Sequence, residues 1–238
     1  MRVLALDTST FTASVAIVDV ATGATLASHA ATTAALSQVL LALVEACTRD
    51  AGVTAAQLDA VAVGVGPGSF TGLRIGLATA KGLAFALDRP LWVASSLAAL
   101  AWAARAQVDT ADVLVPALDA RRGEMYAGLY VRDGAGVRAL AAERVLAPAS
   151  LAAWLAEVAA GRRAVILGDA LDAYAAELAG FAHVDGDRTP TAVAVAHVAA
   201  AGDRVTHLDG GAPAYVRRPE VELQYPDGVP GAARRVLT

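Results

Sequence analysis

Residues 60–76 read AVAVGVGPGSFTGLRIG, and the sequence pattern changes twice within this stretch. Residues 60–65 form a short apolar run, which is typical of a buried strand. A glycine-rich loop follows, and a helical pattern then extends from about residue 71 to residue 87. The stretch therefore predicts a strand that passes through a tight loop directly into a helix.

On both sides of this stretch, the period of the apolar residues predicts more strands and helices. In the first half, strands are expected at residues 3–6, 13–18, 25–30 and 91–94, and helices at 36–52 and 97–106. In the second half, strands are expected at residues 113–118, 124–131, 137–146 and 164–167, and helices at 149–160, 171–178 and 191–201. The order strand, strand, strand, helix, strand, helix thus occurs twice. The tail from residue 210 is expected to be extended or irregular.

This repeated order predicts the fold class. Three meandering strands followed by strands with helical crossovers are the ribonuclease-H-like plan, and two such units face to face form the architecture of actin, Hsp70 and sugar kinases. We therefore expect an α/β, actin-like (ASKHA) fold with two lobes, built from duplicated ribonuclease-H-like βββαβα units. The first lobe is expected at residues 1–108 and the second at residues 109–238, with the boundary near Asp109.

The composition limits the classes of function. The chain has 238 residues, of which 56% are hydrophobic and 18% charged, so it can bury a core. A net charge of −4 disfavours a protein that holds nucleic acid alone, because such a protein usually carries a basic face. Cys47 is the one cysteine, so an intramolecular disulfide is excluded. With no long apolar run for a membrane helix, we expect a soluble, cytoplasmic protein.

The glycine-rich loop of residues 64–76 has two interpretations. Backbone N–H groups between a strand and a helix can hold a phosphate group. The glycines can equally serve tight turns and close packing. The residues do not match a Walker A loop, because no Gly-Lys-Ser/Thr follows at the required spacing.

The helix that follows this loop has a face of small residues. Gly72, Gly76, Thr79, Ala80 and Leu83 share this face on a helical wheel, and Leu73 and Leu77 lie beside it. A surface without bulky side chains lets another helix approach closely. The pattern therefore predicts a helical neighbour, either in this chain or in a partner.

Two aspartates, Asp7 and Asp119, occupy matching places in the repeat, because each lies at the end of the first predicted strand of its half. Actin-like ATPases carry Asp-x-Gly loops there, which handle a metal-bound phosphate or its attacking water. Here the loops lack that glycine, which disfavours a working ATP site. The expected remnant of a phosphate or cleft site consists of Asp7, Thr8, Ser9, Asp119 and Arg121. The four histidines lack ligand-like spacing and no Gly-x-Ser-x-Gly elbow occurs, so we predict no catalytic residue, no metal and no cofactor.

Four segments carry a resemblance to a known family. LALDTS at residues 4–9, GPGSFTGLRIG at 66–76, LDARR at 118–122 and PAYVR at 213–217 resemble the motifs of the TsaB (YeaZ) family, in the same order. The resemblance implies an actin-like relative of TsaD without activity of its own. TsaD transfers threonylcarbamoyl to the adenosine beside the anticodon of tRNA. The His-x-x-x-His metal pair of TsaD corresponds to Ser96 and Leu100 here, and these side chains cannot hold a metal.

The resemblance also implies partners. The chain is expected to bind TsaD as a heterodimer, to meet the ATPase TsaE in the complex, to contact tRNA only indirectly, to form a homodimer when alone and to touch no membrane. The first two helices would form the interface through Leu40, Val44, Gly72, Leu73, Gly76, Leu77 and Ala80. The basic, aromatic tail at residues 213–219 could contact a partner or RNA, or pack on the body. Two other functions remain as alternatives to this role as a TsaD partner. One is an actin-like-fold ATPase or small-molecule kinase, and the other is a peptidase.

Overall fold

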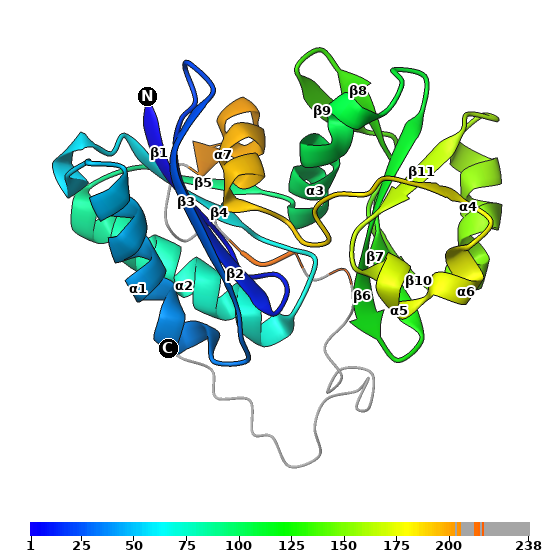
Figure 1. Cartoon of the computed structure of the whole chain (residues 1–238), viewed down its shortest axis with the longest axis horizontal. Coiled ribbons are helices and arrows are strands. Elements are labelled where there is room, and N and C mark those ends of the chain that lie inside the picture. Colours follow the sequence, from blue (N-terminus) through cyan, green and yellow to red (C-terminus); the bar gives the residue numbers. More distant parts are fainter. Residues whose placement is uncertain (203, 206–211, 215, 217–238) are drawn as a thin grey trace, which may run out of the picture.

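Two β-sheets lie side by side in the structure, a computed structural model that describes residues 1–202, 204–205, 212–214 and 216 (Figure 1). The first sheet contains, in order across it, β13 (Arg204–Val205), β5 (Leu91–Ala94), β4 (Ala60–Gly64), β1 (Arg2–Asp7), β2 (Thr12–Asp19) and β3 (Ala24–Thr32). The second contains β10 (Arg144–Leu146), β7 (Glu124–Ala127), β6 (Val113–Arg121), β11 (Ala164–Leu167) and β12 (Ala182–His183), and β8 (Tyr130–Asp133) and β9 (Gly136–Ala139) pair beside β6.

The strand pairing confirms the predicted fold. In the first sheet β1, β2 and β3 form an antiparallel meander, while β4 and β5 run parallel to β1. In the second sheet β6, β7 and β10 are antiparallel neighbours, and β11 and β12 run parallel to β6. The two sheets therefore repeat one order, which is the duplicated ribonuclease-H-like arrangement of an actin-like fold.

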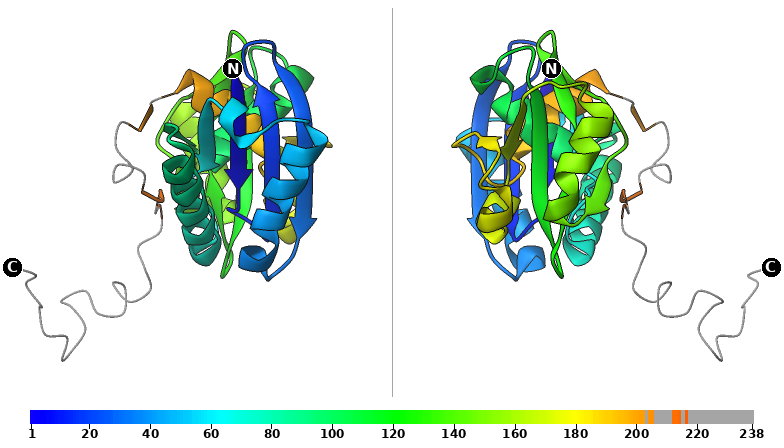
Figure 2. Two further views of the ribbon diagram at one scale, coloured as in Figure 1. Left: turned by 90° about the vertical axis from the view of Figure 1, so that its left-hand side faces the viewer. Right: turned by 90° about the vertical axis from the view of Figure 1, so that its right-hand side faces the viewer.

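Helices cover both faces of the first sheet. The α-helices are α1 (Leu36–Asp50), α2 (Phe70–Leu87), α3 (Ser96–Ala104), α4 (Leu151–Val158), α5 (Ala170–Ala173), α6 (Ala175–Leu178) and α7 (Ala192–Ala201). Short 3₁₀-helices span Ala55–Gln57, Arg105–Gln107 and Pro148–Ser150. α1 and α2 cover the face of the first sheet that is turned away from the second, and α7 covers the other face (Figures 1 and 2).

The burial of β1 shows why its sequence is a continuous apolar run. Leu4 and Leu6 belong to the core between the sheet and α1 and α2, whereas Val3 and Ala5 belong to the core beneath α7. A strand that is covered on both faces needs apolar residues at every position, without the alternation of a half-exposed strand. This is why the first lobe could be predicted closely from its sequence.

The second lobe contains a short strand, β12, that was not predicted, and it differs from the prediction at three further places. The strand expected at residues 124–131 is interrupted after Ala127, because the facing residue of β6 is Pro116, which has no N–H to continue the ladder. Beyond this interruption β8 continues in the same register against β6, with Tyr130 opposite Leu114, and then pairs with β9. The strand expected at 137–146 is divided into β9 and β10. The helix expected at 171–178 is divided into α5 and α6 at Tyr174.

The division of the chain at residue 108 is also less simple than expected. α7 comes late in the sequence but packs on the first sheet, where its Ala192 N–H donates to Ser14 Oγ at 2.9 Å. β13 then pairs with β5 at the edge of the same sheet. α3, from the first half, packs through Leu97 and Leu100 against the second sheet. The two lobes therefore exchange elements, and α3 lies between them (Figure 1).

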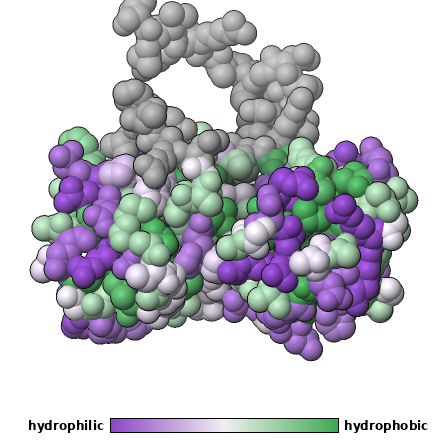
Figure 3. Space-filling model, turned by 90° about the horizontal axis from the view of Figure 1, so that it is seen from above, coloured by the Kyte–Doolittle hydropathy of each residue, from purple (hydrophilic) through white to green (hydrophobic). Residues whose placement is uncertain are grey.

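The hydropathy of the helices and of the outer surface bears on the expectation that the chain touches no membrane. In the part of the chain that the structure describes, no helix combines the length and apolarity that a bilayer span requires. Seen from above, the surface mixes hydrophilic and hydrophobic residues (Figure 3). Of the PAYVR motif, Pro213, Ala214 and Val216 are described, and the Ala214 N–H donates to the carbonyl of Val65 at 2.7 Å. Tyr215, Arg217 and the tail after them lie outside the described residues, so contacts of that tail with a partner or RNA stay predictions.

Candidate functional site

The carboxyl group of Asp7 is buried at the end of β1 and is held by hydroxyl and amide donors. The N–H and hydroxyl of Ser9 donate to Asp7 Oδ1 at 2.8 and 2.6 Å, and the Ser96 hydroxyl donates to Asp7 Oδ2 at 2.8 Å. The Gly66 N–H in turn donates to Ser96 Oγ at 3.2 Å. Burial raises the pKa of Asp7, and the hydrogen bonds from Ser9 and Ser96 oppose that rise. The predicted site residue is therefore enclosed by its own chain.

The glycine-rich loop is what encloses it. Thr8 Oγ1 donates to the carbonyl of Gly72 at 2.8 Å, and the N–H of Ser69 donates to the carbonyl of Ser9 at 2.7 Å. A Cβ atom added to any of four glycines, spaced four residues apart, would lie 2.0–2.3 Å from an atom of residues 7–9. These glycines are Gly64, Gly68, Gly72 and Gly76. Of the two interpretations of the loop, this contact supports close packing within the chain.

The residues predicted for a partner interface lie inside this chain as well. All of them are buried: Leu40, Val44, Gly72, Leu73, Gly76, Leu77 and Ala80. At Gly72 and Gly76 the small-residue face of α2 meets the loop of residues 7–9. Farther along the same face, Ala80 and Leu83 pack in one core cluster with α1, so the expected helical neighbour lies within this chain. An interface on α1 and α2 remains a prediction, and with these residues buried in the single chain it would have to use the exposed residues of the two helices.

In the second lobe, Asp119 and Arg121 do come together at the end of β6. Arg121 Nη1 lies 3.0 Å from Asp119 Oδ2, and the Arg121 N–H donates to Asp119 Oδ1 at 2.8 Å. A break in the register between β6 and β7 puts Arg121 in the left-handed region at φ 64°. The Arg121 guanidinium lies 5.4 Å from the ring centre of Phe11. The loops after β1 and at the end of β6 therefore face each other across the two lobes.

The site also includes residues that sequence reasoning missed. Tyr174 OH donates to Asp119 Oδ1 and lies 2.8 Å from it, and the Asp119 N–H donates to Asp169 Oδ1 at 2.8 Å. Burial raises the pKa of Asp169 to about 6, and the nearby Asp119 carboxylate adds to the rise. Asp169 follows β11 directly after Gly168, and this strand-glycine-aspartate order was a signal that could have found it.

Replacing Asp169 by asparagine is expected to stabilise the chain at pH 7 to 8. In the folded chain the Asp169 carboxyl group holds its proton more tightly than in the unfolded chain, where its pKa has the ordinary value of 3.8. Stability is therefore lost as the pH rises from about 4 through 6. Asp169→Asn keeps the acceptor for Asp119 and removes this loss, raising the free energy of unfolding by roughly 2 kcal/mol after allowance for screening. Denaturant unfolding at pH 4 and pH 8 measures it. An equal gain at both pH values would contradict this assignment.

The start of α3 joins the two lobes through consecutive serines. Ser96 donates to Asp7 of the first lobe, as described above, while the hydroxyl of Ser95 donates to Glu143 Oε1 of the second. Tyr130 OH donates to the same Glu143 oxygen at 2.5 Å. Burial raises the pKa of Glu143, against the effect of these two hydrogen bonds. This arrangement fixes the lobes to each other at the helix start.

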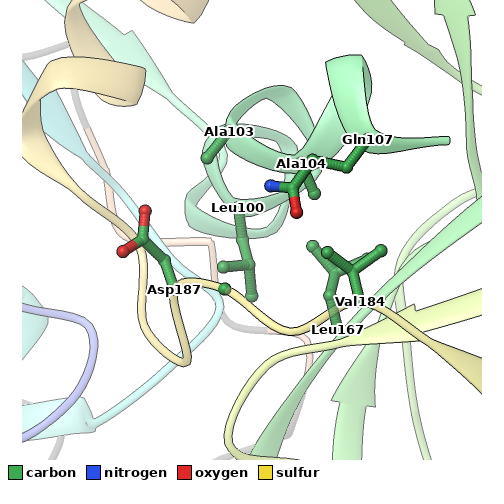
Figure 4. Close-up of a pocket in the computed structure, with 8 residues that line it drawn as sticks. Leu100, Ala103, Ala104, Gln107, Leu167, Val184 and Asp187 are labelled. Atoms are coloured by element: carbon green, nitrogen blue, oxygen red, sulfur yellow. The ribbon is translucent and has the colours of Figure 1, made fainter.

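Ser96 and Leu100, which correspond to the metal-binding histidine pair of TsaD, both make other contacts here. The Ser96 hydroxyl is bound to Asp7, and Leu100 lies in the apolar core between α3 and the second sheet. Leu100 also lines a small pocket with Leu167 and Val184, with Gln107 and Asp187 at its rim (Figure 4). Its volume of about 20 Å³ suits a water molecule, whereas ligand pockets usually measure at least ~300 Å³. Among the described residues, no three metal-binding side chains cluster.

Comparisons with known proteins give consistent matches. Residues 30–164 match the family model described as TsaD, tRNA N6-adenosine threonylcarbamoyltransferase. The Haemophilus influenzae "tRNA threonylcarbamoyladenosine biosynthesis protein TsaB" is 38% identical over 133 residues, 56% of this chain and 55% of that protein. The chain thus spans little more than half the length of the curated relatives that it matches.

Solved structures extend the likeness over nearly the whole chain. The structure of YeaZ from Pseudomonas aeruginosa is 32% identical, with a TM-score of 0.73 over 90% of this chain and 99% of that one. The activator of the 2-hydroxyisocaproyl-CoA dehydratase from Clostridium difficile is 13% identical, with a TM-score of 0.51 over 84% of this chain and 93% of that one. This second likeness bears on the fold alone.

Proposed function

Because this chain belongs to the family that the TsaD model describes, and within it to the TsaB (YeaZ) proteins, we propose that it serves tRNA threonylcarbamoyladenosine formation as a non-catalytic partner of a TsaD-type transferase. The observation that carries the proposal is the enclosure of Asp7 by residues 64–76. An aspartate that is fully buried cannot reach a substrate. The most distinctive sequence motif of the chain thus holds the fold together.

The metal positions support the same proposal. A transferase of this kind would need metal ligands where this chain has a hydroxyl bound to Asp7 and a leucine in the core. Between the two lobes, Arg121 is paired with Asp119 and lies 5.4 Å from the ring centre of Phe11, so the charge that could meet a phosphate is already engaged. Chemistry would therefore rest with the partner.

The exposed sides of α1 and α2 are the proposed contact for the TsaD-type subunit. Leu41 of α1 is 60% exposed and Phe85 of α2 is 77% exposed, although large apolar side chains are normally buried. Ala78 and Gly82 lie between Arg74 and Phe85 on the same side of α2, where small residues let a helix approach closely. We name this set, Leu41, Arg74, Ala78, Gly82 and Phe85, the outer stripe.

The outer stripe would serve homodimers and heterodimers alike. A second copy of the chain and a TsaD-type subunit would then compete for the same residues, and a TsaE-type ATPase would join only the heterodimer. With a net charge of −4, the chain would contact tRNA indirectly through the complex.

A reconstituted reaction tests the proposal. TsaD, TsaE and the enzyme that supplies the threonylcarbamoyl adenylate are expected to modify tRNA only after this chain is added, and the chain alone is expected to modify none. Mass spectrometry of nucleosides from the digested tRNA measures the product. Full modification by the other components without the chain would refute the proposed role.

A further inference from the structure

The C-terminal end of α3 meets the hairpin formed by β8 and β9, and an arginine comes from each side. Arg105 follows α3, and its Nε donates to the carbonyl of Ala135 in the hairpin turn at 2.8 Å. Tyr130 of β8 packs toward α3, and side chains two residues apart on a strand share a face. Arg132 therefore points to the same side as Tyr130, toward α3 and Arg105.

The two guanidinium groups are held differently. Arg105 uses Nε and Nη1 for backbone carbonyls, with Nη1 at 2.6 Å from the carbonyl oxygen of Trp102, and its guanidinium lies 3.4 Å from the centre of the Trp102 ring. Trp102 stacks in turn on His197 at 4.3 Å. Arg105 is thus fixed in place, with its Nη2 remaining for a further acceptor.

Arg132 has no such support. Its Nε is buried, and in the part of the chain that the structure describes Arg132 has no hydrogen-bond or ion-pair partner. A buried polar atom without a partner costs free energy. Burial and the charge of Arg132 together hold the pKa of Arg105 below its usual range. The fold therefore brings two positive charges together without a described carboxylate between them.

We propose that Arg105 and Arg132 form a binding site for a phosphate group at the junction of α3 and the β8–β9 hairpin. A phosphate carries up to two negative charges and several acceptor oxygens, which match two adjacent guanidinium groups. It would give Arg132 a partner that the described residues do not supply, and it would offset the repulsion from Arg105. The phosphate can belong to free phosphate or to an RNA backbone, and these sources can be distinguished experimentally.

The first experiment measures the thermal unfolding temperature in rising inorganic phosphate, against sodium chloride of matched ionic strength. The wild-type chain is expected to gain about 2–4 °C from phosphate at saturating concentration. Arg132→Gln is expected to lose this gain, and Arg132→Lys to keep part of it. Arg138→Gln is the control, because Arg138 lies on β9 opposite Val131 and so on the other face of the same hairpin.

The unfolding temperature without phosphate separates binding from structure. Because the buried Nε of Arg132 has no partner among the described residues, its removal should leave Arg132→Gln as stable as the wild type, or more stable, when phosphate is absent. The second arm measures the anisotropy of fluorescently labelled tRNA. If the natural source is RNA, Arg132→Gln is expected to bind tRNA about tenfold more weakly than Arg138→Gln; if it is free phosphate, the two bind tRNA alike and only the phosphate gain differs. A phosphate gain that is missing in the wild type, or equal in Arg132→Gln, would overturn the proposal.

Discussion

Replacing Gly72 by alanine is expected to lower the free energy of unfolding by about 3 kcal/mol. A Cβ at this position would lie 2.1 Å from the carbonyl oxygen of Thr8. That oxygen belongs to the backbone of a buried loop, so it cannot move away as a flexible side chain could. The substitution would push the loop of residues 7–9 off α2 and disturb the hydrogen bonds around Asp7. Urea unfolding followed by circular dichroism measures the effect.

Gly82→Ala in the same helix is the matched control. A Cβ at Gly82 has no described atom within 4 Å, and alanine favours a helix over glycine by roughly 1 kcal/mol. The two changes, identical in chemistry, are therefore expected to shift stability in opposite directions when measured in dilute solution. If Gly72→Ala were as stable as the wild type, the packing role of the glycine motif would be wrong.

Replacing Phe85 by glutamate is expected to weaken binding to the TsaD-type subunit by about 100-fold. Phe85 is 77% exposed, so folding gains little from it, whereas a partner that covers it would have to bury the new charge. The free energy of unfolding of the isolated chain should stay within about 0.5 kcal/mol of the wild type. Isothermal titration calorimetry with the purified subunit measures the affinity.

Leu26→Glu provides the comparison for this change. Leu26 is also an exposed apolar residue, at 37%, but it lies on β3. The same charge placed there should leave the affinity unchanged. Equal binding by the Phe85 variant and the wild type would remove the outer stripe as the contact surface.

The first lobe could be predicted from its sequence because its local signals agree. The apolar runs of β1 and β4 reflect burial on both faces, and Ser95 and Ser69 each cap a helix where the sequence changes pattern. The second lobe was harder to predict. β7 ends at Ala127 because Pro116, on the neighbouring strand β6, has no N–H for the next hydrogen bond, and this effect lies outside the sequence of β7 itself. α7 shows another limit: a helix of alanine and valine reveals that it is buried, but not which sheet it covers.

The interface residues show why site prediction was weaker than fold prediction. Leu40 and Val44 carry the apolar helical pattern that a partner surface also has, and one sequence cannot separate the two. The glycines of α2 were correctly associated with close approach, but their neighbour is the loop at Thr8. That pairing joins residues about sixty positions apart, which only the fold brings together. For the same reason, we expect Gly76→Leu to disrupt folding. If Gly76 faced a partner, the isolated chain would tolerate this substitution.

The central claim is that this chain works by binding a TsaD-type subunit through α1 and α2 and performs no chemistry itself. Size-exclusion chromatography with light scattering, on the chain alone and mixed with that subunit, tests the binding most directly. The account predicts a complex of one copy of each protein, lost on Phe85→Glu and kept on Leu26→Glu. Separate elution of the two wild-type proteins at micromolar concentration would contradict it.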